Sequence, residues 1–194
     1  MTQRPTARDR MLTSAIALFR ERGIDATSFA DVIERAEAPR GSIYHHFPGG
    51  KTQLAEEATR TAGSVTESLI ETSLAQGDPS DALTRIIDVF RRQLLKSDFR
   101  SGCPVAAGAL EGGDFPAARD IAGETFTAWE TIIAAALTHR GVPVSRAESL
   151  ATTAVTTIEG ALLVARAQRS VRALDRVAAE LCGLFDAAVG ERTR

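Results

Sequence analysis

The stretch from Thr27 to Lys51 limits the possible folds of this chain more than any other. It reads as two short helices joined by a tight turn. Either Thr27 or Ser28 can cap the first helix, because both hydroxyls suit an N-cap. A Pro at position 39 then pre-sets φ for a second helix, expected from about residue 40 to residue 47. The first helix carries one apolar stripe at helical spacing, formed by Phe29, Val32, Ile33 and Ala36.

The second of these helices is short and polar. Its apolar anchors are Ile43 and Phe47, four residues apart, so the helix buries little by itself. Its other side chains suit phosphates and base edges in a DNA major groove. The layout therefore predicts a helix-turn-helix that reads DNA. The polar side chains in question are those of Arg40, Ser42, Tyr44, His45 and His46.

A set of residues between about positions 8 and 56 shares its spacing with a known family. The set is Gly23, Ala26-Thr27-Ser28, Asp31-Val32, Ala36, Gly41-Ser42-Ile43-Tyr44-His45-His46-Phe47 and Lys51. With these residues the stretch resembles the DNA-binding domain of TetR-family bacterial transcription regulators. The Pro-Gly-Gly-Lys run after Phe47, together with Gly102-Cys103-Pro104-Val105, is similar to the LmrA/YxaF-like branch, which includes drug- and flavonoid-responsive repressors.

The resemblance and the helix geometry together imply roles for individual residues. Base edges would be read by Arg40, Ser42 and His45, while Gly41 would let the backbone approach closely. Phosphates would be bound by Thr27, Tyr44, His46 and Lys51. The full set of candidate DNA-binding residues is Thr27, Ser28, Arg40, Gly41, Ser42, Tyr44, His45, His46 and Lys51.

Two departures from the family pattern accompany this resemblance. Glu37 stands in the inter-helix turn where the family usually has Gly. If that position is left-handed, a non-Gly residue there costs roughly 1–2 kcal/mol. The loop before Lys51 is also one residue longer than the commonest family form, which bears on whether Lys51 reaches the same phosphate.

The whole chain favours an all-α fold. It contains much Ala but only 8 Phe, 1 Tyr and 1 Trp, and it shows no strand-like alternation. We expect about nine helices in two domains: residues 1–50 as the DNA-binding domain, and residues 51–194 as an effector-binding and dimerisation domain. Residues 1–51 hold eight Lys/Arg against six Asp/Glu, net +2, whereas the chain as a whole is −2. This asymmetry has the sign expected of a DNA-binding end.

An effector pocket is expected in the second domain, because the resembling family binds effectors between these helices. Glu159, in a largely apolar helix, is the best candidate to orient a ligand. The alternative is that these residues form plain core. The candidates are Phe90, Leu94, Cys103, Val105, Phe115, Phe126, Trp129, Ile133, Glu159 and Leu163.

The last two helices, near residues 146–169 and 170–189, are expected to pair with those of a second chain as a four-helix bundle. The alternative is a monomeric core. The candidate interface residues are Ala154, Ile158, Ala161, Leu162, Ala165, Val177, Leu181, Leu184, Phe185 and Ala188.

The cysteines and the composition bear on the expected cellular compartment and on the kinds of site the chain can contain. Cys103 and Cys182 are far apart without a CxxC motif, so we expect reduced thiols in a cytoplasmic protein. Neither a signal peptide nor a membrane span is expected. Adjacent His45 and His46 point about 100° apart on a helix and no third ligand is nearby, so no metal site is expected. No other cofactor and no catalytic residue is expected either.

These features together predict a homodimeric repressor that leaves a palindromic operator when a small hydrophobic or aromatic effector binds. The helix from about residue 51 to residue 75 is expected to be the only continuous element that touches both domains, and so to carry the signal. Two alternatives remain open: a helical enzyme that uses Cys103, and a DNA-binding activator or orphan regulator without a ligand.

Overall fold

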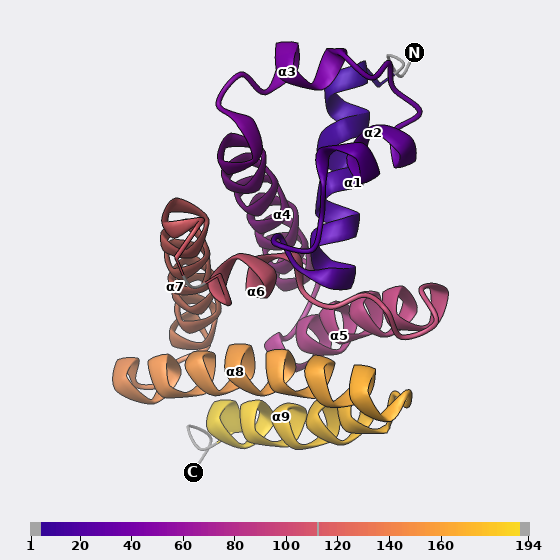
Figure 1. Cartoon of the computed structure of the whole chain (residues 1–194). Coiled ribbons are helices and arrows are strands. Elements are labelled where there is room, and N and C mark those ends of the chain that lie inside the picture. Colours follow the sequence, from indigo (N-terminus) through magenta and orange to yellow (C-terminus); the bar gives the residue numbers. More distant parts are fainter. Residues whose placement is uncertain (1–4, 112, 191–194) are drawn as a thin grey trace. The chain divides into compact units, whose positions relative to one another are not determined.

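The computed structural model describes residues 5–111 and 113–190. The described residues form helices and no strands, which confirms the predicted all-α class (Figure 1). In this part of the chain the helices are α1 (Ala7–Arg22), α2 (Phe29–Arg35), α3 (Ser42–His46), α4 (Gly50–Leu74), α5 (Pro79–Lys96), α6 (Pro104–Ala109), α7 (Pro116–His139), α8 (Val144–Gln168) and α9 (Arg172–Gly190).

The two helices that precede α3 start and stop where local chemistry dictates. At the start of α1, Thr6 and Asp9 form a reciprocal capping box. Gly23 ends α1 with φ 88°, a conformation that only Gly adopts without strain. At the start of α2 it is Ser28, not Thr27, that forms the capping box, with Asp31 as its partner.

Three other helices begin without a side-chain cap. Helix α3 begins at Ser42 rather than near Arg40, and the Ser42 N–H bonds back to the Pro39 carbonyl in a turn. Helix α8 has Pro143 at the N-cap, and Ser145 lies inside the helix. Asp78 precedes α5 without capping it, and its carboxylate pairs with Arg140 instead.

Packing divides the chain into two units. Unit 1 comprises the described parts of Met1–Ser64 and of Cys103–Thr125, and unit 2 comprises those of Val65–Gly102 and Phe126–Arg194. Helices α4 and α7 each run without interruption from one unit into the other. The functional boundary expected at residue 50 stays a prediction.

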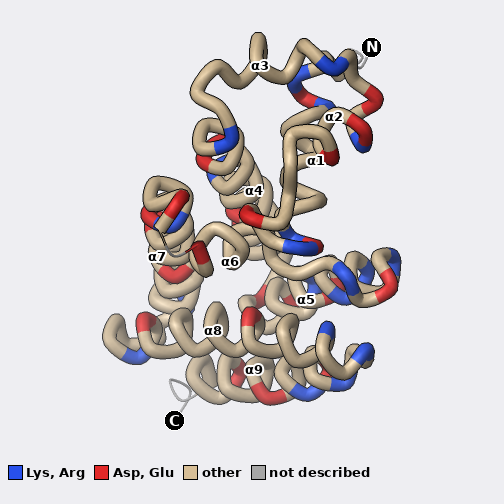
Figure 2. The backbone as a smooth tube through the Cα atoms, in the orientation of Figure 1, with Lys and Arg blue, Asp and Glu red and all other residues tan. Residues whose placement is uncertain are grey.

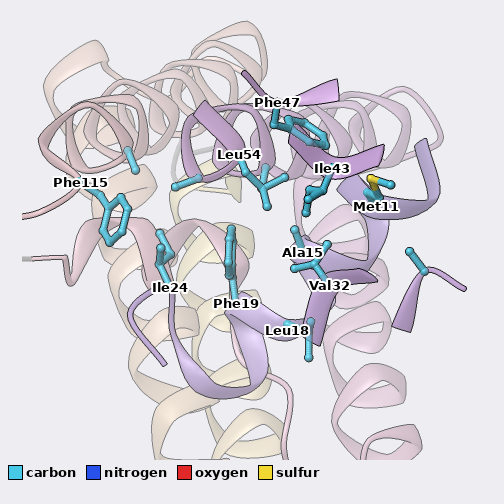
Figure 3. Packing of buried hydrophobic residues seen from close by; sticks show 14 residues of the cluster. Met11, Ala15, Leu18, Phe19, Ile24, Val32, Ile43, Phe47, Leu54 and Phe115 are labelled. Carbon is cyan, nitrogen blue, oxygen red and sulfur yellow. The ribbon is translucent and has the colours of Figure 1, made fainter. Parts of the chain in front are cut away.

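The core of unit 1 joins the first helices to a segment far along the sequence. Phe115 and Ala118 are buried in the same cluster as Phe19, Ile24 and Leu54. Figure 3 shows the Phe115 ring beside Ile24. Phe115 was expected in the effector pocket, but its side chain is buried in the core of unit 1.

Two glycines let helices of unit 1 approach closely. A Cβ on Gly63 of α4 would lie 2.8 Å from the Cγ2 of Thr125 in α7. A Cβ on Gly108 of α6 would lie 3.0 Å from the Thr59 hydroxyl and 3.1 Å from the Ala118 carbonyl oxygen. A larger residue at either position would therefore force the neighbouring side chain or the helices to shift.

In unit 2, α5, α8 and α9 pack against one another, and the buried face of α8 is rich in Ala and Leu. Among the described helices, α8 is long and apolar enough by length and composition to cross a membrane. A core helix of a globular protein passes the same test, and Ala147, Leu150, Ala151 and Ala154 of α8 are buried here.

Candidate DNA-binding site and effector cavity

The short helix α3 has one buried and one exposed side. Ile43 and Phe47 are fully buried in the core of unit 1. Arg40, Gly41 and His45 are exposed, and His46 is half-buried. Figure 2 shows that α3 itself carries no charged residue, and that a basic residue marks the start of α4. The helix thus carries hydrogen-bonding side chains but no Lys, Arg, Asp or Glu, and Arg40 lies just before it in the sequence.

Tyr44 is the most prominent residue of this surface. Its side chain is 66% exposed, and its ring meets the Phe29 ring edge-on, with 5.5 Å between centroids. This contact between α3 and α2 fixes the direction of the ring. A phosphate contact by its phenolic hydroxyl stays a prediction.

Several hydroxyls of the predicted set are already used within the protein. Thr27 is 2% exposed, and its hydroxyl donates to the Gly23 carbonyl at 2.8 Å. In this conformation Thr27 cannot donate to a phosphate, which corrects the role expected of it. Ser28 serves the cap of α2, and the Ser42 hydroxyl donates to the Pro39 carbonyl at 2.7 Å.

Lys51 likewise has partners inside unit 1. Its Nζ donates to the Asp25 carbonyl at 3.0 Å and lies 5.2 Å from the centroid of the Phe115 ring. The ammonium thus joins the start of α4 to the loop between α1 and α2. A phosphate contact by Lys51 stays a prediction and would have to share the ammonium with these partners.

The turn between α2 and α3 carries the departure noted in the sequence. Glu37 has φ 50°, so the position that holds Gly in the family is left-handed in this chain. Arg10 of α1 reaches this turn, since its Nε donates to the Ala36 carbonyl at 3.1 Å. This hydrogen bond thus connects the strained turn to α1.

A carboxylate network surrounds the start of α2. Asp31 accepts bonds from the Ser28 hydroxyl at 2.6 Å and the Ser28 N–H at 2.8 Å, and it pairs with Arg22 at 2.8 Å. These bonds, those from Ser28 first, lower the pKa of Asp31 from 3.8 to about 2. Asp31 therefore stays ionised and its cap intact at neutral pH.

Unit 2 contains a small apolar cavity of about 30 Å³. Four predicted pocket residues line it: Phe90, Trp129, Ile133 and Glu159. The prediction missed the contribution of α4 and the neighbouring positions on α5 and α8. The missed lining residues are Thr66, Ile70, Leu83, Ile86, Val155 and Ile158.

The other predicted pocket residues lie elsewhere. Cys103 and Val105 are buried in unit 1, at the start of α6. Leu94 is buried in α5 without lining this cavity, and Leu163 is 68% exposed on α8. Phe126 does not line the cavity, but its ring packs edge-on against Trp129 at 5.4 Å between centroids.

Most of the predicted interface residues are buried within the single chain. Their side chains fill the space between α8, α9 and α5, and Ile158 also lines the cavity. Only Leu184, at 39% exposure, and the half-buried Val177 keep appreciable surface. The residues buried in this way are Ala154, Ile158, Ala161, Leu162, Ala165, Leu181, Phe185 and Ala188.

Comparison with known families agrees with this geometry. Residues 11–58, which include the capped helix α2 and the reader helix α3, match the bacterial regulatory proteins of the tetR family. Residues 79–180 match the C-terminal domain of LmrA/YxaF-like transcriptional regulators. The chain belongs to the TetR family.

Relatives of this TetR-family protein are similar over nearly their whole lengths. An uncharacterized HTH-type transcriptional regulator of Mycobacterium tuberculosis, Rv0196, is 42% identical over 193 residues, covering 96% of this chain and 98% of the relative. YxaF of Bacillus subtilis, another uncharacterized regulator of this type, is 32% identical, covering 84% and 87%. A TetR regulator from Legionella pneumophila shares the fold, with a TM-score of 0.83, 20% identity, and coverage of 93% and 97%.

Membership of the TetR family assigns the helix-turn-helix its function: this protein is a DNA-binding regulator of transcription. The relatives and the two matched families are transcriptional regulators, not enzymes. The enzymatic alternative built on Cys103 therefore falls away. The LmrA/YxaF-like branch expected from the sequence is confirmed.

Proposed function

We propose that this TetR-family regulator is a cytoplasmic homodimeric repressor that releases a palindromic operator when a small hydrophobic or aromatic effector binds in unit 2. The observation that carries this proposal is the cavity lined from α4, α5, α7 and α8. Its surface is almost wholly apolar, although Glu159 and Thr66 are among the lining residues. Such a site suits a hydrophobic or aromatic ligand.

The size of the cavity bears on how an effector enters. A volume of about 30 Å³ is far below that of a typical ligand pocket, which is on the order of 300–1,000 Å³. Binding therefore requires the lining side chains and helices to move apart. We take this closed cavity as the effector-free state, and its expansion as the event that the effector drives.

Two helices can transmit the movement of the cavity lining to the helix-turn-helix. Helix α4 contributes Thr66 and Ile70 to the cavity and has Lys51 in its first turn. The sequence predicted α4 as the only continuous link, but α7 also runs through both units and contributes Trp129 and Ile133 to the cavity. A coupling of about 1–3 kcal/mol would weaken operator binding about 5- to 150-fold.

The dimer interface is proposed on the exposed face of α8 and the adjoining edge of α9. A stripe of six exposed residues along α8 carries no charge, although the exposed Arg146 and Glu148 lie beside its start. Added Cβ atoms on Gly160 of α8 and Gly183 of α9 would meet open space, so a second chain can approach both helices closely. The residues of this uncharged stripe are Ser149, Thr152, Thr156, Gly160, Leu163 and Ala167.

Two-fold pairing would set two reader helices about 34–36 Å apart, or a multiple of this, to enter successive major grooves. A tilt that changes this spacing would weaken binding at both half-sites together. Release of DNA thus needs only a small movement of each protomer.

A fluorescence titration tests the proposal. Trp129, the only tryptophan in the chain, is 3% exposed and lines the cavity, so neutral aromatic compounds that enter should quench it. The titration is run with and without a duplex from the region upstream of the protein's own gene. Linkage requires the duplex to weaken ligand binding by the factor by which the ligand weakens DNA binding. Equal ligand affinity in both titrations would show binding without allostery and exclude this mechanism.

A further inference from the structure

A buried carboxylate outside the helix-turn-helix holds the loop between α1 and α2. The Oε1 of Glu111 accepts a hydrogen bond of 3.1 Å from the backbone N–H of Ile24, 87 positions earlier in the chain. Glu111 is only 9% exposed, and Ile24 is fully buried. We infer that Glu111 is a positioning residue for DNA binding, although it touches no part of the reader helix itself.

The loop that Glu111 holds determines where α2 begins. Within it, the Thr27 N–H bonds to the Ile24 carbonyl at 3.0 Å, and the Thr27 hydroxyl bonds to the Gly23 carbonyl. Ser28 follows at once as the cap of α2. Because α3 packs on α2 through Tyr44, a displacement of this loop also displaces the reader helix.

A second contact holds the same loop from the start of α4. Lys51 donates to the Asp25 carbonyl while its ammonium lies over the Phe115 ring. Phe115 also shares the buried cluster that contains Ile24 (Figure 3). The loop is therefore held at two successive residues: Ile24 by Glu111 of the connection between α6 and α7, and Asp25 by Lys51 of α4.

Glu111 acts here as a hydrogen-bond acceptor. The Ile24 N–H follows the end of α1 and is buried, so removal of the carboxylate would leave this donor without a partner. The loop would then have to move to satisfy the donor, and α2 would move with it. This role depends on DNA binding by the TetR-family reader, and not on an effector or on the direction of regulation.

The test compares E111Q, E111D and E111M in the full chain. The probe is a duplex that the wild-type protein has selected in vitro from random sequence, so wild-type binding is established beforehand. E111Q keeps an acceptor and should bind within about twofold of wild type. E111M should bind about tenfold more weakly, because the buried donor loses its partner. E124M, which replaces an exposed glutamate on α7, is the matched control and should bind like wild type.

Two further readouts separate positioning from a direct DNA contact and from general instability. The dependence of affinity on salt should keep its wild-type slope in E111M, because no phosphate contact is lost. Amide hydrogen exchange at Ile24 should accelerate in E111M while that of the α8 and α9 core stays slow. If E111M does not fold, E111D serves in its place, since its shorter side chain withdraws the acceptor.

The inference is overturned if the variants without the acceptor bind the duplex with wild-type affinity. It is also overturned if E111Q is weakened as much as E111M, since the charge rather than the hydrogen bond would then matter. Unchanged exchange at Ile24 in a weakened variant would likewise exclude the mechanism.

Discussion

The guanidinium of Arg10 holds the carbonyl of Ala36, with 3.1 Å between Nε and O, immediately before the left-handed residue Glu37. One bond from α1 thus fixes the turn in which a non-Gly residue takes a conformation that favours Gly. The family usually keeps Gly at this place, and this chain retains the backbone geometry without it.

Replacement of Glu37 by Gly should therefore raise the free energy of unfolding. Relief of the left-handed strain is worth roughly 1–2 kcal/mol, and the added freedom of the unfolded chain offsets about 0.4–1 kcal/mol of it. Urea unfolding should show a net gain of about 0.5–1 kcal/mol. Glu34→Gly is the matched control: the same change at an exposed site inside α2 should cost about 1 kcal/mol. Equal destabilisation by the two changes would contradict strain at Glu37.

Arg40 and Tyr44 should differ in how their loss affects DNA recognition. Arg40→Ala should lower discrimination by roughly 1–3 kcal/mol at one base pair, because its fork can bond a base edge in two places. Tyr44→Phe keeps the ring contact with Phe29 and removes only the hydroxyl, so it should weaken all sequences alike. Binding to a set of single-base operator variants measures both. An unchanged base preference in Arg40→Ala would show that this residue does not read a base.

The cap of α2 should respond to pH through Asp31. The pKa of Asp31 in the folded state, about 2, lies below its ordinary value of 3.8. The unfolded state therefore binds the proton more readily, and the stabilising contribution is complete above about pH 4 and lost as pH falls toward 2. An NMR titration of the carboxyl carbon should place the midpoint near 2. In Ser28→Ala the midpoint should move up toward 3.8, since the bond from that hydroxyl is the largest cause. A wild-type midpoint near 3.8 would contradict the network.

The proposed dimer face can be tested with two exposed leucines. Leu163→Glu places a charge on the uncharged stripe of α8 and should produce monomers with weakened operator binding. Leu95→Glu makes the same change at the exposed leucine of α5 and should leave the dimer intact. Sedimentation at micromolar concentration separates the two outcomes. A wild-type chain that sediments as a monomer would refute the proposed assembly.

Local features of the fold could be predicted from the sequence because their causes are local. The Thr6–Asp9 spacing indicates a capping box, and Gly23 marks the end of α1. The choice between Thr27 and Ser28 could not be made from the sequence, since both hydroxyls suit a cap. It depends on the burial of Thr27 against the end of α1, which is a tertiary contact.

The errors at the candidate sites have a common physical origin. An apolar stripe shows that a helix face is covered but not what covers it. Ile158 and Leu181 were expected to face a second chain, yet they are buried within their own. Phe115 was expected to line a pocket, yet it is buried in the cluster that contains Ile24. The Glu111–Ile24 bond spans 87 positions and left no local signal in the sequence.

The close approach of Gly63 and Thr125 limits how the protein can respond to a ligand. These residues fasten α4 to α7 in unit 1 just before both helices continue into unit 2. Under the proposed function, a ligand that displaces either helix in unit 2 would act on the other helix through this contact. A methyl group at position 63 would lie 2.8 Å from the Thr125 Cγ2, so the Thr125 side chain or the two helices would have to shift and the coupling should change.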